Sequence, residues 1–438
     1  MRYFLMGLVF LSSLFVDAQT AKTIIDQLTI INNTITNSPC QNTTSLISNR
    51  AMNVFLADKM GYASERTDLS FYTNYISLNT ADGKVSVSHN FQKNKPIDER
   101  IKKLLNIGIT TNTFKGSVPM FLDKMLQNEI TLTINYKWLG KVKTTVESCL
   151  PGRNNINQKQ EMDVLRASIL SVLISEIKKK EVDFESVLAT VDSDEVPGQN
   201  IDLAKATMRK YFHEKLQEEY SLKFATLQAE VLSDKQYFKL ISTHYTSFSI
   251  NTPVIYPQYY VASSISTKFQ QKHSYPLEII LSHTRFWESM RIGRIFLSIG
   301  GNVLFNNSVS NYALTKTNLT DYKNLGGSDT NYLATLQNNK AYIGNYKTFI
   351  TPLLSVRLNY FPPSSHIGLS ILADQSIGSY SMLNARFGLP IVLINSKNMP
   401  AVNLEFYVLF YDVNNRMKWR NNKSVGVGMG IPLSRLMY

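Results

Sequence analysis

The chain ends in a stretch whose apolar residues fall at every second position. Val425, Val427, Met429, Ile431 and Leu433 alternate with three glycines and a proline. Successive side chains of a β-strand point to opposite faces, so this spacing predicts a strand with one apolar face and one nearly bare face. Such a strand suits a wall that meets apolar surroundings on one side and leaves room for bulky neighbours on the other.

The same alternation recurs in two blocks of the chain. The earlier block predicts strands at 69–78, 84–91, 100–114 and 128–140. The later block predicts strands at 261–269, 276–286, 290–305, 349–360, 366–373, 381–394, 402–412 and 424–433. Short connections alternate with long polar ones. The count of twelve strands is even, but residues 240–260 form either an irregular entry to the fifth strand or an extra strand, and fourteen strands is an alternative.

Helical spacing replaces the alternation in two places. Apolar residues from Ile24 to Ile35 predict one or two helices in an N-terminal segment, 19–67. An insertion at 144–238 contains two long predicted helices, 161–180 and 201–232, joined by an acidic connection. The run Lys178–Lys180 is expected to be the solvated end of the first helix.

The N-terminus predicts export. Arg2, an apolar run at 4–16 and the small residue Ala18 give residues 1–18 the layout of a secretory signal peptide, with a membrane anchor helix as the alternative. An exported chain with two cysteines can form one disulfide, so Cys40 and Cys149 are candidates for a bridge. Two unpaired buried thiols are the alternative.

Together these features resemble the bacterial outer-membrane β-barrel class. The resemblance covers the predicted signal peptide, residues 68–143 and residues 239–438, and it includes the aromatic final residue, Tyr438. It implies a mainly β fold, an antiparallel transmembrane β-barrel of about 12 strands in the cell outer membrane. Residues 68–143 would supply the first four strands and 239–438 the rest. Both termini and the helical insertion would lie in the periplasm, and 306–346 would be a long extracellular loop.

The net charge and the absence of catalytic motifs limit the partners and activities that the sequence predicts. The net charge of +13 on an exported protein favours anionic lipopolysaccharide or another anionic polymer as a partner over nucleic acid, although lysines in solvated loops would also account for it. The sequence contains no metalloprotease, phosphate-loop or serine-elbow motif, so we expect no enzymatic activity, no cofactor and no metal. His283 and His366 are expected on inner faces of strands, with no Ser or Asp tied to them by sequence.

Five charged residues are expected to point into the lumen. They would form either a salt-bridged ladder that closes a narrow barrel or the lining of an anion-attracting pore: Glu278, Arg294, Arg357, Arg386 and Glu405. The predicted function is a pore or transport component for a small solute, with the helical insertion as a gate or docking site. The alternative is a non-conducting barrel that anchors a helical module, 144–238, for a periplasmic protein or peptidoglycan. Outer-membrane lipid and lipopolysaccharide are the expected surroundings.

Overall fold

The structure is a computed structural model. It describes residues 21–39, 46–60, 75–79, 84–91, 98–112, 121–122, 125–126, 130–146, 158–191, 201–254, 256–264, 269–310, 313–324, 332–378, 381–395, 400–414 and 423–432. The predicted signal peptide, 1–18, and both cysteines, Cys40 and Cys149, lie outside the described residues.

Twelve antiparallel strands form a closed barrel. In chain order they are β1 (Tyr75–Asn79), β2 (Lys84–Phe91), β3 (Lys103–Asn112), β6 (Thr131–Leu139), β8 (Leu240–Pro253), β11 (Glu278–Ser289), β12 (Gly293–Asn307), β15 (Thr348–Phe361), β16 (Leu369–Ser376), β17 (Leu383–Ile394), β18 (Pro400–Phe410) and β19 (Lys423–Pro432). Each pairs with the next, and β1 pairs with β19 to close the ring. A short strand, β7 (Lys143–Thr145), adds to the edge of β8. The predicted fold class, a barrel with helical segments, is confirmed.

The last strand shows why one face is bare. The glycines of β19 lie opposite the large inward side chains of β18: Gly426 pairs with Tyr407 and Gly428 with Glu405. All four residues are buried, whereas the outward Val425 is 77% exposed. The glycine face therefore makes room for Tyr407 and Glu405 inside the barrel. Apolar outward positions and polar inward positions are the pattern of a barrel whose wall meets lipid.

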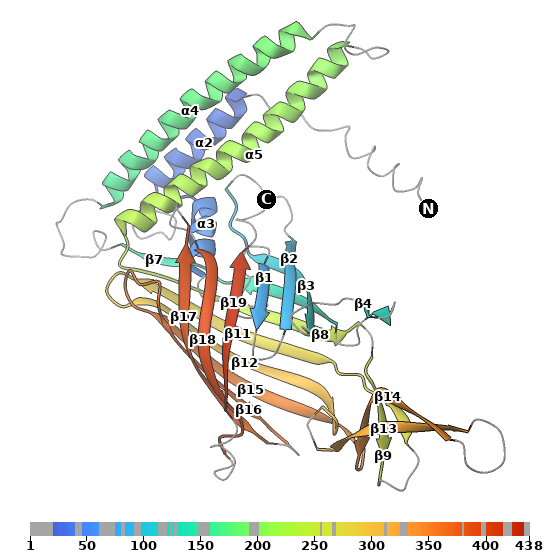
Figure 1. Ribbon diagram of the computed structural model, residues 1–438. Helices are drawn as coiled ribbons and strands as arrows, with labels where there is room; N and C mark the ends of the chain where they lie inside the picture. Colours follow the sequence, from blue (N-terminus) through green and yellow to red (C-terminus); the bar gives the residue numbers. More distant parts are fainter. Residues whose placement is uncertain are drawn as a thin grey trace.

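The two ends of the barrel differ (Figure 1). At one, which we call the helical end, lie α2 (Ala21–Thr36), α3 (Asn49–Met60), α4 (Gln158–Thr190) and α5 (Ile201–Lys235). The opposite loop end carries a four-stranded sheet of β9 (Gln258–Ala262), β10 (Gln270–His273), β13 (Thr315–Asn324) and β14 (Tyr332–Ile343). A small hairpin of β4 (Phe121–Leu122) and β5 (Met125–Leu126) is separate from this sheet. The predicted loop 306–346 therefore contains two strands of its own.

One predicted barrel strand is wrong. The fifth strand of the wall is β8, at 240–253, whereas part of 261–269 belongs to β9 in the small sheet. The inward face of β8 carries Ser247 and Ser249, and its outward face carries His244 and Thr246 before the apolar Phe248. Both faces are therefore partly polar, and the alternation that identifies the other strands is weak here.

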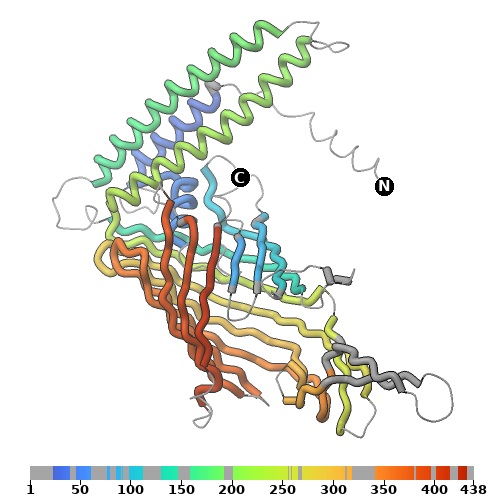
Figure 2. The backbone as a smooth tube through the Cα atoms, viewed as in Figure 1, coloured from blue at the N-terminus to red at the C-terminus, as the bar shows by residue number. Residues whose placement is uncertain are grey.

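Three of the helices pack together along one core (Figure 2). Ile24 and Leu28 of α2, Leu173 of α4, and Leu216 and Phe224 of α5 are all buried in it. The helix α4 runs past the predicted end at residue 180, because Leu188 is buried and the Phe184 ring stacks on that of Phe212 at 3.9 Å. Lys180 is consequently in mid-helix, with its Nζ 2.7 Å from Glu219 Oε1. None of the described helices is long and apolar enough to cross a membrane.

Candidate functional site: the plugged mouth of the barrel

The mouth of the barrel at the helical end is occupied by α3 (Figure 1). Nine of its twelve residues are buried, and they lie on every side of the helix. Because buried residues lie on every side, other elements enclose the helix. We therefore call α3 the plug helix.

The plug helix packs against the inner wall of the barrel. Its apolar side chains share one core with Tyr245, Phe286, Phe296 and Phe361, which are buried residues of β8, β11, β12 and β15. Phe55 of the plug meets Phe238 edge to face, with ring centroids 5.7 Å apart. Burying each large side chain contributes roughly 1.5–3 kcal/mol, so this core holds the plug firmly in the mouth.

Polar groups fix the start of the plug helix to the barrel. Ser48 Oγ accepts a hydrogen bond from the Ala51 amide at 3.1 Å, as an N-terminal capping side chain does. Asp98, from the connection between β2 and β3, accepts the Arg50 amide at 2.9 Å. Burial raises the pKa of Asp98 above its ordinary value, and the hydrogen bonds from Arg50 and Asn49 oppose that shift. The negative carboxylate also suits the positive end of a helix dipole.

Three hydrogen bonds join the plug segment to α5, and we call them the latch. Gln228 Oε1 accepts the Ser48 amide at 2.9 Å. Arg50 Nη1 donates to Ser221 Oγ at 2.7 Å, and Lys59 Nζ donates to Ser233 Oγ at 2.8 Å. The latch residues lie in the C-terminal part of α5, which leads into β8, and the rest of the helix extends away from the barrel.

Lys59 is a half-buried cation of the plug helix. Burial lowers the pKa of its ammonium group, and the nearby Arg294 guanidinium lowers it further, while Glu288 acts in the opposite direction. Arg294 and Glu288 are themselves paired on the barrel wall, with Nε and Oε2 2.6 Å apart. The Lys59 ammonium group, whose charge burial disfavours, therefore lies near Glu288, a carboxylate that Arg294 already neutralises.

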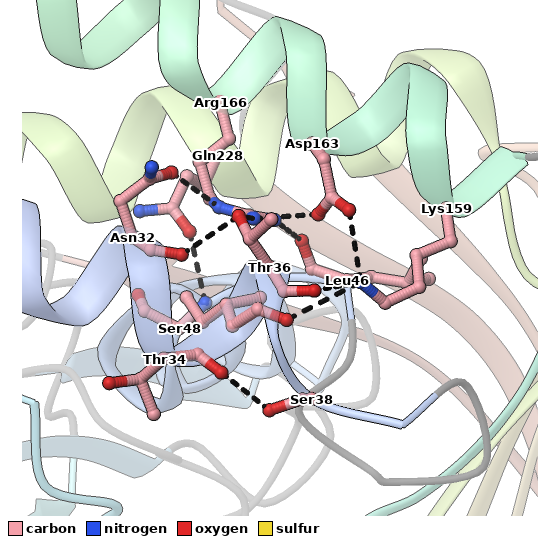
Figure 3. Close-up of polar contacts among 11 residues, drawn as sticks. Asn32, Thr34, Thr36, Ser38, Leu46, Ser48, Lys159, Asp163, Arg166 and Gln228 are labelled. Atoms are coloured by element: carbon pink, nitrogen blue, oxygen red, sulfur yellow. Dashed lines mark hydrogen bonds and ion pairs between the residues drawn. The ribbon is translucent and has the colours of Figure 1, made fainter.

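A fully buried arginine ties the plug segment to the other helices (Figure 3). Arg166 of α4 donates to Asn32 Oδ1 at 2.9 Å and to Thr36 Oγ1 at 2.7 Å, both on α2. It also donates to the Leu46 carbonyl at 2.8 Å, just before the plug, and to Asp163 Oδ1 at 2.6 Å. One side chain thus fixes α2, α4 and the start of the plug segment relative to each other.

Three of the five predicted lumen charges line one cavity in the barrel. Arg357 of β15 and Arg386 of β17 flank Leu372 of β16 at the same level of the wall. Together with Glu405 they line a small pocket on the inner wall. Glu405 pairs with Arg386 at 3.0 Å and accepts a hydrogen bond from Ser370. Two arginines and one glutamate leave this cavity with a net positive set of side chains.

The other two predicted charges lie apart from this cavity. Glu278, near the loop end of β11, accepts hydrogen bonds from Asn251 at 2.8 Å and from Asn302. Arg294 is at the helical end, beside the plug. Each is bonded to residues on adjacent strands, as in the salt-bridged ladder that the sequence predicts as one alternative. These contacts follow the inner wall and do not cross the lumen. Whether the five residues line a conducting pore stays a prediction.

Both histidines lie elsewhere than expected. His283 faces outward, because it is exposed and pairs with Ile299 of β12, which is also exposed on the outer wall. Phe286, buried against the plug, sets the register of β11 and so turns His283 to the outside. His366 lies in the turn between β15 and β16 rather than on a strand.

Sequence reasoning missed several residues of the site. Lys137 is buried on the inner face of β6, as the alternation of Thr133 and Asn135 with apolar neighbours could have shown. The plug itself had a signal, since residues 51–57 are apolar in nearly every position. The latch and the Arg166 junction join residues far apart in the sequence, and no local pattern marks them.

Comparison with known proteins adds no argument to the geometry described above. No family model matches the chain, and no curated protein matches it. Among solved structures, the beta domain of the Bordetella autotransporter BrkA matches with 6% sequence identity and a TM-score of 0.26, over 82% of this chain and 96% of that one.

The architecture itself defines the class. A closed antiparallel barrel with an even number of strands, an apolar outer surface and a polar inner wall is the fold of bacterial outer-membrane β-barrel proteins. The class predicted from the sequence is therefore confirmed, at the level of the fold.

Proposed function

We propose that this protein is an outer-membrane channel that the plug helix holds closed and that passes a small anionic solute when the plug moves. In this proposal the helical end faces the periplasm and the loop end faces the lipopolysaccharide leaflet. The role is transport and needs no catalytic residue or cofactor.

The observation that carries the proposal is the attachment of the plug. The plug is held both by the wall, through an apolar core, and by α5, through the latch. A plug fixed only to the wall would have no means of release. Because the latch joins it to a long hairpin, a partner that displaces α5 would change the free energy of the closed state directly.

The charge of the cavity supports the choice of solute. Arg357 and Arg386 outnumber Glu405, and Arg386 also stacks on the Tyr407 ring, with its guanidinium carbon 3.6 Å from the ring centroid. Stacking and pairing hold this arginine in place against the wall. A fixed cationic constriction attracts anions and repels cations.

Swelling of proteoliposomes tests the proposal. The wild-type protein is expected to pass small sugars and anions slowly, and Phe55→Asp, which places a charge in the apolar core of the plug, is expected to pass them rapidly. Ser186→Asp, on an exposed position of α4, is the matched control and should behave like the wild type. A Phe55→Asp protein that is folded, as shown by a heat-dependent shift in gel migration, yet impermeable would refute the channel.

The alternative function is a non-conducting anchor for the helical hairpin. One observation favours it: α4 and α5 project well beyond α2 (Figure 1), and their far portions expose Val182, Val187 and Leu203. Such a surface would suit a periplasmic protein, and peptidoglycan is the other predicted partner. An impermeable Phe55→Asp protein that still binds its partner through the hairpin would favour this function.

A further inference from the structure

The outer wall carries a cluster of basic and aromatic side chains at the helical end. We call it the basic–aromatic patch, and it consists of Lys103, Trp138, Lys143, His244, His283, Arg285 and Trp287. At the same end, outward positions of β12, β16 and β17 hold apolar residues instead: Ile295, Leu369 and Leu393. The charged residues of the patch lie in one sector of the wall, formed by β3, β6, β7, β8 and β11.

Strand register brings the patch together. Lys103 pairs with Trp138, which pairs with Thr246, which in turn pairs with His283. One level closer to the helical end, His244 pairs with Arg285. Neighbouring strands lie about 4.8 Å apart, so these side chains are adjacent on the surface. Since Lys103, His244, His283 and Arg285 are all exposed, they can reach a ligand from the membrane.

Several contacts hold the patch in one arrangement. The rings of His244 and His283 lie 5.5 Å apart, and His283 Nδ1 is hydrogen-bonded to Thr246 Oγ1 at 3.0 Å. The Arg285 guanidinium lies over the Trp287 ring, 5.5 Å from its centroid. Gly140 gives the His244 ring its space, because a Cβ at this position would overlap that ring. The imidazoles are therefore placed by the fold rather than left loose on the surface.

The electrostatics of the patch favour an anion. The patch gathers five basic side chains on four neighbouring strands: Lys103, Lys143, His244, His283 and Arg285. A cluster of positive side chains on a lipid-facing wall is unfavourable unless a negative group neutralises it. Tryptophans mark the level of the lipid headgroups, and Trp138 and Trp287 border the cluster.

We propose that the basic–aromatic patch is a binding site for the phosphate of an anionic phospholipid in the leaflet at the helical end. The phosphate oxygens would accept hydrogen bonds from Arg285, Lys103 and the two imidazoles, and the acyl chains would lie along the apolar wall above them. Phosphate offers several strong acceptor oxygens and suits arginine geometry. The site rests on the outer-membrane orientation proposed above but is independent of the plug.

Lipid binding by the full-length protein in neutral detergent tests the site. The probes are phosphatidylglycerol, phosphatidylcholine and inorganic phosphate, with bound lipid measured by native mass spectrometry. The wild type is expected to retain phosphatidylglycerol in preference to phosphatidylcholine, with phosphate alone unable to displace it. Each removed cation should weaken binding about five-fold, so Arg285→Gln combined with Lys103→Gln should weaken it about 25-fold.

Lys423→Gln is the matched control, because this exposed lysine begins β19 at the loop end. It should bind phosphatidylglycerol like the wild type. Equal retention of both lipids, unchanged binding by the double variant, or displacement by phosphate alone would each overturn the site. None of these outcomes bears on whether the barrel conducts, so failure here is distinct from failure of the proposed channel.

Discussion

Lys59 of the plug helix and Ser233 of α5 are joined by a hydrogen bond of 2.8 Å, and this bond holds a cation that burial disfavours. The hydroxyl of Ser233 accepts from the ammonium group but carries no charge to neutralise it. Apolar packing and the latch together hold the plug in the mouth, and the cost of burying the Lys59 charge offsets part of that stabilisation.

The pH dependence of the plug follows from this lysine. Because its pKa in the folded protein lies below 10.5, the folded state binds fewer protons than the unfolded state between that lowered pKa and 10.5. The free energy of unfolding therefore rises as the pH rises through this window. Denaturant midpoints measured at about pH 8 and about pH 10 should show the rise in the wild type and a smaller rise in Lys59→Met. Lys215→Met, at an exposed lysine whose pKa is raised by Glu218, should not reduce the rise.

Removing the buried arginine should destabilise the helical end. Arg166→Met leaves the Leu46 carbonyl and Asp163 without their shared donor, and breaking a buried pair of this kind costs about 3–5 kcal/mol. Arg209→Met breaks an exposed pair with Glu185, and the loss of stability should be far smaller because solvent screens this pair. Thermal unfolding followed by circular dichroism at the helical signal measures both. Equal effects of the two substitutions would contradict the role of Arg166 as the junction.

A glycine on the inner wall should resist substitution. A Cβ at Gly388 would overlap Glu405 and Ser370, so Gly388→Ala must displace the partner of Arg386. Such overpacking typically costs about 1–3 kcal/mol. Gly301→Ala meets only ordinary contacts, at 3.7 Å from Leu353 and Leu354, and serves as the control. The temperature at which the folded form disappears on a gel should fall for Gly388→Ala alone.

The wall of the barrel was largely predictable from the sequence, and its contents were not. The glycines of the last strand predicted a bare inner face, and Tyr407 and Glu405 occupy that space. Period-two alternation identifies a strand only when one face is apolar and the other is polar. It did not identify β8, because serines face inward and the polar His244 faces outward. That position belongs to the proposed lipid site, so the exception to the pattern coincides with a candidate function.

The candidate site depends on contacts that no local pattern records. The apolar residues around Phe55 predict a buried helix, but they do not say that the barrel itself encloses it. The hydrogen bond between Arg50 and Ser221 spans 171 positions of sequence. Hydrophobic periodicity reports the face that a segment buries, and only the folded chain shows which element covers that face.

The cavity arginines should set the ion preference once the channel is open. In a protein opened by Phe55→Asp, the further change Arg357→Gln should reduce the ratio of anion to cation permeability by about two-fold. Reversal potentials across a salt gradient measure this ratio. Arg291→Gln, in the exposed turn between β11 and β12, provides a control away from the cavity. An unchanged ratio in Arg357→Gln would remove this residue from the conducting path.

The measurement that tests the central claim most directly is the open probability of single channels in a planar bilayer, compared between the wild type and Arg50→Ala combined with Gln228→Ala. These changes remove two latch bonds worth about 3 kcal/mol together. The equilibrium constant between the closed and open states should therefore shift about 100-fold towards the open state. The account predicts a wild type that is almost always closed and a double variant with frequent stable openings, while Arg209→Ala, elsewhere on α5, stays closed. A permanently open wild type, or a folded double variant as silent as the wild type, would contradict the claim that α5 holds the plug in the barrel.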